Sequence, residues 1–154
     1  MATGNLSKEA NEDFQRLATE AVKAATYLIE KNNGFLPLVL YVQPDGALAF
    51  ADFAGQEVLE QQPEALDYLA LAQAALRPLA QRGELRATAL ACDVRMKANA
   101  TEPLVDAIRV DLEHRDGDCI SFFQPYSVEV GEVAYGASIC QAQKAMIFGA
   151  APEA

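Results

Sequence analysis

Two Asp-Gly turns constrain the fold of this chain more than any other feature of its sequence. Pro44-Asp45-Gly46 separates the apolar runs 35–43 and 47–52, and Asp116-Gly117 separates the runs 104–114 and 118–126. Turns this short join strands that lie side by side and run in opposite directions. Parallel strands would need a crossover of a dozen or more residues. The chain is therefore predicted to form an antiparallel sheet.

The predicted register of the first hairpin places large apolar side chains on one face. With Gly46 as the bulge residue after a type I turn, Val42 pairs with Leu48 and Leu40 pairs with Phe50. The opposite face of the same strands carries smaller apolar residues, which leave room for another element to pack closely.

The second hairpin allows two registers. A three-residue loop with Gly117 in the bulge pairs Leu112 with Ile120 and Val110 with Phe122, whereas a two-residue turn shifts every pair by one residue. The three-residue loop keeps apolar residues opposite apolar residues, so it is the predicted register. The other face then carries Arg109, Asp111 and Glu113 beside Phe123, Ser121 and Cys119.

Two segments have the periodicity of amphipathic helices. The first runs from about Ser7, a suitable N-cap, to Asn33-Gly34, which suits a helix end. The second runs from about Pro63 to Arg82 and contains Pro78, which predicts a kink near its end. The remaining strand-like runs are 85–98, 104–114, 118–126 and 132–139.

The element order α-β-β-α-β-β-β-β predicts an α+β fold. We expect an antiparallel sheet of about five to six strands with two helices packed on one face. A chain of 154 residues suits a single domain, with terminal tails at about 1–6 and 149–154. The element order resembles that of roadblock and profilin-like domains and, more loosely, that of type III secretion chaperones, which are also small, acidic and dimeric. No family motif accompanies the resemblance, so it implies no site residues.

The charge of the chain restricts its partners. Twelve basic and 22 acidic residues give a net charge of −10. Nucleic acids and anionic membranes need a cationic surface, so neither is expected as a partner. Residues 40–68 contain six acidic residues and no Lys or Arg, whereas residues 77–97 have an excess of basic residues. A basic protein is the partner that this charge favours.

The cysteines and the N-terminal sequence predict a cytoplasmic protein. Cys92, Cys119 and Cys140 are widely spaced and odd in number, which is typical of reduced thiols. The first residues contain no apolar stretch of the kind found in a signal peptide.

Cofactor and metal chemistry lack the residues they need. His114 is the only histidine, which excludes paired-histidine metal sites. The glycines do not form a GxGxxG or GxxxxGK[ST] loop, so no nucleotide cofactor is predicted. The expectation is a protein with no metal and no cofactor.

The weak catalytic candidates are His114, Cys119, Asp111 and Glu113. A thiolate of Cys119, or alternatively of Cys92, paired with His114 would be a nucleophile. A histidine at a hairpin end is more typical of an exposed turn residue, and a strand cysteine of a small core residue. Asp111 and Glu113 are two residues apart on one strand face, and the neighbouring Arg109 indicates charge pairing instead of acid–base chemistry. Enzymatic activity is therefore left open and not favoured.

The leading hypothesis is a non-enzymatic protein–protein interaction module, such as an adaptor, a secretion chaperone or an immunity protein, that forms a homodimer. The candidate interaction residues mix charge with aromatic side chains: Arg109, Phe123, Tyr126, Tyr135 and Phe148. The triplet 146–148 either closes the core or makes a dimer contact. The alternative hypothesis is a small-molecule-binding domain or weak enzyme. Its pocket would lie between the sheet and the second helix, where these residues would converge: Tyr41, Cys92, Tyr126 and His114.

Overall fold

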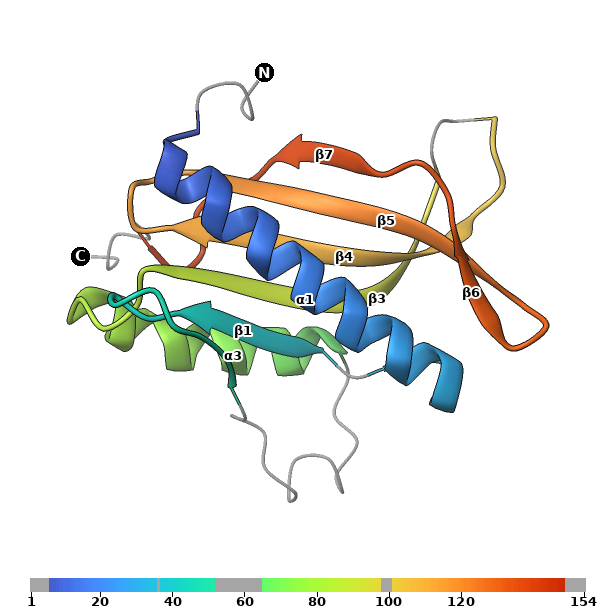
Figure 1. Ribbon diagram of the computed structural model, residues 1–154, viewed down its shortest axis with the longest axis horizontal. Coiled ribbons are helices and arrows are strands. Elements are labelled where there is room, and N and C mark those ends of the chain that lie inside the picture. The colour runs from blue at the N-terminus through green and yellow to red at the C-terminus, as the bar shows by residue number, and fades with distance from the viewer. Residues whose placement is uncertain (1–5, 36, 52–64, 98–100, 149–154) are drawn as a thin grey trace.

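The computed structural model describes residues 6–35, 37–51, 65–97 and 101–148 (Figure 1). In chain order the elements are α1 (Lys8–Asn32), β1 (Leu38–Val42), β2 (Leu48–Ala51), α3 (Ala65–Gln81), β3 (Ala87–Met96), β4 (Val105–His114), β5 (Cys119–Glu129), β6 (Glu132–Tyr135) and β7 (Ile139–Ala142). The predicted α+β class and element order are confirmed, with one strand more than expected. The run 132–139 was predicted as one strand, but its pairing with β5 is interrupted at residues 136–138, where the register shifts by one residue, and two short strands form. The expected tail at 149–154 and residues 1–5 lie outside the described residues.

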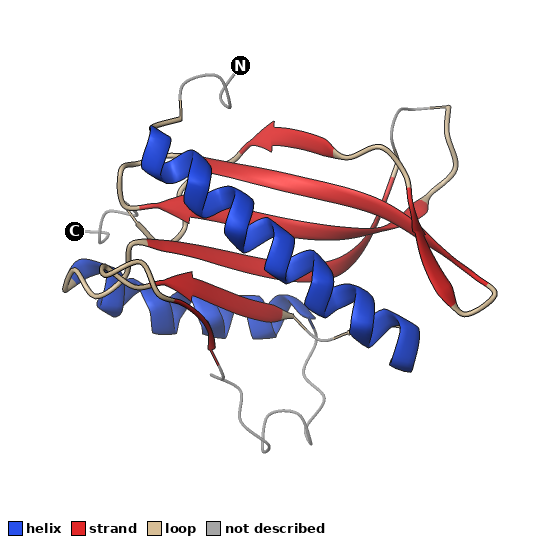
Figure 2. Ribbon diagram, in the orientation of Figure 1, coloured by secondary structure: helices blue, strands red, loops and turns tan. Residues whose placement is uncertain are grey.

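All strand pairs are antiparallel, as predicted (Figure 2). The strands lie in the order β2-β1-β3-β4-β5-β6, and β7 also pairs with β5. β6 pairs with the end of β5 and β7 with its beginning, so the two short strands share one edge of the sheet. The expected count of five to six strands is exceeded by this divided edge.

Both predicted hairpin registers are confirmed. Val42 pairs with Leu48 in the first hairpin, and Leu112 pairs with Ile120 in the second. Gly46 has φ 94° and Gly117 has φ 98°, the left-handed conformation that the bulge position requires.

Helices α1 and α3 cover opposite faces of the sheet, so the prediction that both predicted helices pack on one face is wrong (Figure 1). α1 packs on the face that carries Leu40 and Ala89. α3 packs on the face that carries Val39 and Leu90. Neighbouring residues of a strand point to opposite faces, and β1 and β3 are apolar on both. A strand of that kind must be covered on both sides, which a single layer of helices does not achieve.

Helix α1 begins and ends where its capping residues predict. Ser7 Oγ accepts the N–H of Ala10 at 3.1 Å. Asn33 ends the helix in the left-handed conformation with φ 63°. Small residues on its buried side lie against a strip of alanines in β3, which allows close helix-to-sheet packing. Within the described residues, neither helix is long and apolar enough to cross a bilayer.

Candidate functional site

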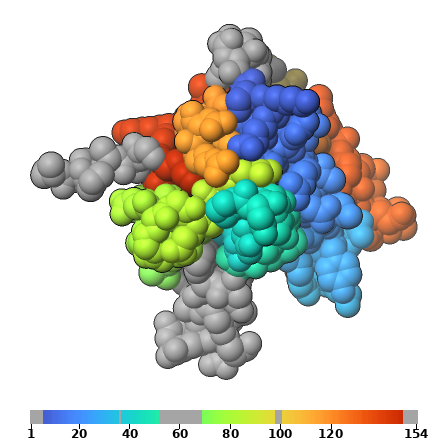
Figure 3. Space-filling view, turned by 60° about the vertical axis from the view of Figure 1, so that its left-hand side comes forward, coloured from blue at the N-terminus to red at the C-terminus, as the bar shows by residue number. Residues whose placement is uncertain are grey.

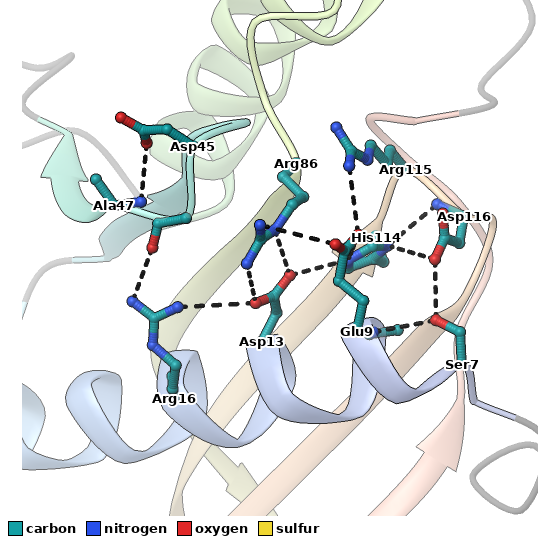
Figure 4. A network of polar contacts seen from close by, with 12 residues as sticks. Ser7, Glu9, Asp13, Arg16, Asp45, Ala47, Arg86, His114, Arg115 and Asp116 are labelled. Carbon is teal, nitrogen blue, oxygen red and sulfur yellow. Dashed lines mark hydrogen bonds and ion pairs between the residues drawn. The ribbon is translucent and has the colours of Figure 1, made fainter.

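A polar network with a buried centre joins the start of α1 to the sheet (Figure 4). We define it by five residues: Glu9, Asp13, Arg86, His114 and Asp116. The start of α1, the β1–β2 turn and the β4–β5 turn meet at this end of the molecule (Figure 3). Because Asp13 belongs to the apolar stripe of α1, its carboxylate points into the core and is only 1% exposed.

Asp13 is the centre of this network. Arg86 binds it with two hydrogen bonds, from Nε to Oδ2 at 2.9 Å and from Nη2 to Oδ1 at 2.8 Å. His114 Nε2 lies 3.0 Å from Oδ2. A guanidinium that binds both oxygens of a carboxylate fixes its position as well as its charge.

The pKa of Asp13 is lowered despite its burial. Desolvation by itself raises this pKa, but the hydrogen bonds and charges of Arg86 and His114 outweigh it. Asp13 is therefore ionised at neutral pH, where its charge is neutralised by the guanidinium.

His114 is fully buried, so the interpretation of it as an exposed turn residue is wrong. The N–H of Asp116 donates to Nδ1 at 3.1 Å, which assigns the ring proton to Nε2 and makes Nε2 the donor to Asp13. The ring also packs edge to face with that of Phe14, with ring centroids 6.1 Å apart. His114 is the last residue of β4, and strand alternation points it toward α1.

The structure does not bring His114 and the thiols together. Cys119 pairs with Glu113 and Cys92 with Arg109, on the face opposite to His114. Burial raises the pKa of both thiols to about 11, so both are protonated at neutral pH. Cys140 is exposed on β7. The arrangement therefore gives no support to a nucleophilic Cys–His pair among the described residues.

The network offers ligand atoms for a cation, but it satisfies itself without one. Glu9, Asp13 and His114 each have a donor atom within 4.8 Å of the others. Both oxygens of Asp13 are already bound by Arg86. Two carboxylates, of Glu9 and Asp13, also meet three guanidinium groups. The remaining pairs are Arg16 with Asp13 at 3.8 Å, Arg86 with Glu9 at 3.7 Å and Arg115 with Glu9 at 3.4 Å. The arrangement is best explained as a structural lock between α1 and the sheet.

Glu113 is the centre of a second buried site, on the face covered by α3. Its carboxylate accepts three consecutive backbone N–H groups, from Met146 at 2.8 Å, Ile147 at 2.9 Å and Phe148 at 3.1 Å. Arg77 Nε donates to the carbonyl of Met146 at 2.7 Å. Burial raises the pKa of Glu113 more than the three N–H groups lower it. We call residues 143–148 the C-terminal segment. Glu113, which is only 2% exposed, binds the last three residues of this segment.

Asp111 is engaged in charge pairing, as the sequence indicated. Arg109 Nε donates to Asp111 Oδ1 at 2.9 Å, and its guanidinium lies 5.7 Å from the ring centre of Phe123. Ser121 Oγ lies 2.6 Å from Asp111 Oδ1 and 3.0 Å from Gln143 Oε1. Asp111 and Glu113 thus have separate partners, which gives no support to an acid–base pair.

The five candidate interaction residues fall into different environments. Tyr126 is buried and donates to Asp93 at 2.7 Å, while burial and this bond raise the pKa of Tyr126. Phe148 is buried with Ile147 in the core under α3, so these two residues of the triplet 146–148 close the domain's own core. Arg109 and Phe123 are partly buried. Tyr135 is 50% exposed, with its hydroxyl bonded to Thr26 Oγ1.

A hollow of about 640 Å³ lies between the β1–β2 hairpin and α3. Tyr41 and Leu76 are among its lining residues. Cys92, Tyr126 and His114, which were expected to converge there with Tyr41, do not line it. Two of them lie on the α1 face of the sheet, because strand alternation separates residues that the sequence alone leaves free to meet.

Sequence reasoning did not find the roles of Asp13 and Arg86, or the binding of the C-terminal segment by Glu113. One signal was present: an acid in the apolar stripe of a helix needs a buried cationic partner. The partner itself is 73 residues away, and the pairing depends on the fold.

No protein-family model, curated protein or solved structure matches the chain. The resemblance in element order to roadblock and profilin-like domains therefore stays a prediction. Any function must be inferred from the geometry and chemistry of these residues.

Proposed function

We propose that this protein is a non-enzymatic protein–protein interaction module that forms a homodimer through one apolar end of the molecule. Six of the eight large apolar side chains that are exposed in the described part of the chain support this proposal: Tyr27, Leu104, Val105, Val128, Val130 and Tyr135. We call these six residues the apolar end. Concentrated exposed apolar surface of this kind is typical of an interaction site.

Strand pairing and helix contacts gather these residues. Asp106, which follows Val105, pairs with Tyr126, and Tyr126 pairs with Tyr135. Thr26, the neighbour of Tyr27, bonds to the hydroxyl of Tyr135. Glu30 of α1 accepts the N–H of Val133 at 2.9 Å, so β6 lies beside the second half of α1 (Figure 1). In an isologous contact the apolar end of one copy packs against the apolar end of the other, so both are buried.

Val130 at the tip of the β5–β6 hairpin gives the strongest support. It is fully exposed, and its φ is 53°, a conformation that is unfavourable for a β-branched residue. Asn-Gly is the usual sequence for such a two-residue turn, and here it is Val130-Gly131. Backbone strain of this kind is concentrated at functional sites. A partner that covers Val130 would explain why an apolar residue occupies the tip.

The chemistry of the interior favours binding over catalysis. Both ring nitrogens of His114 have protein partners, and the ring is buried. Cys92 and Cys119 have raised pKa values. The three free cysteines fit a reducing compartment, so we place the module in the cytoplasm.

The oligomeric state tests the proposal. Light scattering after gel filtration should give the mass of a dimer for the wild-type chain. The double variant Val128→Thr with Val130→Asn removes apolar surface and should give a monomer. The matched control is Leu71→Gln, at an exposed apolar residue of α3 outside the apolar end, which should stay dimeric. A wild-type chain that is monomeric at every concentration, or a dimer that the double variant leaves intact, refutes the proposal.

The proposal includes a basic protein as a further partner, because the net charge of the chain is −10. An acidic surface attracts such a partner over long range, and salt screens the attraction. Binding to basic proteins should therefore weaken as ionic strength rises. Binding that is independent of salt would contradict this part of the proposal.

A second candidate function is the binding of a small apolar molecule in the hollow beside Tyr41. Its volume of about 640 Å³ is in the range of small-molecule sites, and it combines aromatic, aliphatic and polar lining residues. An NMR screen of aromatic fragments should shift the resonances of Tyr41 and Leu76 together. Fragments that shift neither residue would exclude this function.

A further inference from the structure

We infer that the groove between α3 and β4 is a peptide-binding site, which this chain fills with its own C-terminal segment. The ligand class is a short peptide that bends so that consecutive N–H groups point the same way, and that carries two adjacent large apolar side chains. This inference goes beyond the proposed dimer, because the groove lies on the α3 face and not at the apolar end.

The C-terminal segment is held in the way that a receptor holds a peptide. After β7 ends at Ala142, residues 143–148 form neither helix nor strand. Their backbone is bound by side chains from other elements, since Glu113 accepts three N–H groups and Arg77 donates to one carbonyl. Contacts to the peptide backbone do not depend on its sequence, so any segment that can adopt the bend of residues 146–148 can make them.

Two adjacent side chains of the segment provide the anchors. Ile147 is 3% exposed and Phe148 is 7% exposed. They belong to the core cluster formed with these residues of β1, β3, α3 and the loop before β3: Val39, Leu90, Ala72, Leu76 and Leu85. Burial of large apolar side chains is favourable in proportion to the apolar surface removed from water. These two positions therefore give the site its selectivity for large apolar residues.

Glu113 is suited to bind a peptide that leaves and returns. A buried carboxylate without hydrogen bonds is costly, so the groove favours an occupied state. Thr88 is the direct cross-strand neighbour of Glu113, and its buried Oγ1 has no hydrogen-bond partner among the described residues. Cross-strand neighbours have Cβ atoms only about 5 Å apart. Rotation of Thr88 can thus supply a donor to Glu113 when the N–H groups of the segment leave.

The segment competes with any external peptide because it is tethered next to the groove. A short tether corresponds to an effective concentration on the order of millimolar. The wild-type chain is therefore blocked by its own residues, and weakening these anchors should open the site.

A fluorescent synthetic peptide with the sequence of residues 143–148 tests the inference by anisotropy. The full-length variant Ile147→Gly with Phe148→Gly should bind it saturably, and the wild-type chain should bind it about ten-fold more weakly or not at all. Adding Glu113→Gln to the open variant should weaken binding about ten-fold, because a charged acceptor of three N–H groups is lost. A matched peptide with serine at both anchor positions should not bind.

Folding is checked by far-UV circular dichroism. If the double variant does not fold, the milder Phe148→Ala replaces it, and Arg77→Met replaces Glu113→Gln. Folded open variants that do not bind the peptide overturn the inference. Binding that persists equally with Glu113→Gln or Arg77→Met, or with the serine peptide, also overturns it. Because the dimer test uses different residues, failure of either proposal leaves the other intact.

Discussion

Replacing Asp13 with asparagine tests the interpretation of the buried network as a structural lock. The substitution keeps the shape of the side chain and removes its charge. In the wild-type protein this carboxylate accepts two hydrogen bonds from Arg86 and one from His114. In the variant the amide NH₂ group faces one of these donors, and Arg86 loses its main counter-charge.

The expected cost follows from the burial of the pair. Removing one partner of a buried ion pair costs about 3–5 kcal/mol, because the other charge stays buried and unpaired. Arg86 keeps 16% of its side chain exposed, and Glu9 lies 3.7 Å from it, so the stranded guanidinium retains some water and a second acid. We therefore expect the lower end of the range, about 3 kcal/mol. For a domain of this size the melting temperature should fall by about 6–12 °C.

Urea unfolding followed by far-UV circular dichroism measures this cost. The pH dependence gives an independent check. The pKa of Asp13 is lowered in the folded state, so its contribution to stability is present above the ordinary value of 3.8 and is lost as the pH falls through the folded-state pKa. The difference between wild type and Asp13→Asn should therefore be full at neutral pH and shrink in acid.

The matched control is Glu20→Gln on the same helix, where the exposed Glu20 pairs with Lys23 at 3.5 Å. An exposed pair of this kind contributes less than about 0.5 kcal/mol. If Asp13→Asn costs no more than this control, or if its cost is unchanged in acid, the interpretation of the network as a charge-dependent lock is refuted.

Three further predictions concern turns and thiols. Gly117→Ala should lower the free energy of unfolding, measured in urea, by about 1–2 kcal/mol. The cause is backbone strain at φ 98°, since an added Cβ would meet no other atom. An unchanged urea midpoint would contradict this prediction. Val130→Asn should instead stabilise the monomer by about 1 kcal/mol, because Asn tolerates its positive φ; a loss of stability would show that Val130 makes stabilising contacts within the chain. In the folded protein at neutral pH a thiol reagent should label the exposed Cys140 first, the partly buried Cys119 more slowly, and the buried Cys92 only on unfolding. Mass spectrometry of the labelled peptides measures this order, and labelling of Cys92 as early as Cys140 would contradict its burial.

Local signals were sufficient to predict much of the fold. The Asp-Gly turns fixed the hairpin registers, because apolar residues had to pair with apolar residues across the strands. Capping by Ser7 and Asn33 marked the ends of α1. These features depend on residues that are close in the sequence.

The placement of α3 was not predictable from its own periodicity. Its apolar stripe shows that one side is buried, but not against which face of the sheet. Val39 and Leu90, pointing away from α1, had to be covered by some element. The strand order places β1 and β3 at neighbouring positions in the sheet, where both faces are apolar. Only this order shows that α3 must cover the face opposite to α1.

The sequence alone determined the class of the domain, the antiparallel pairing, the two hairpin registers and the acidic charge, because each depends on composition or on neighbours along the chain. Only the tertiary structure decided what the polar residues do. His114 meets Asp13 across 101 residues of sequence, and Glu113 meets the C-terminal segment across more than thirty. The fold decides these pairings, because it determines which side chains are buried next to one another. A buried charge is stable only when it lies beside a hydrogen-bond donor or an opposite charge, and that partner can come from any part of the chain.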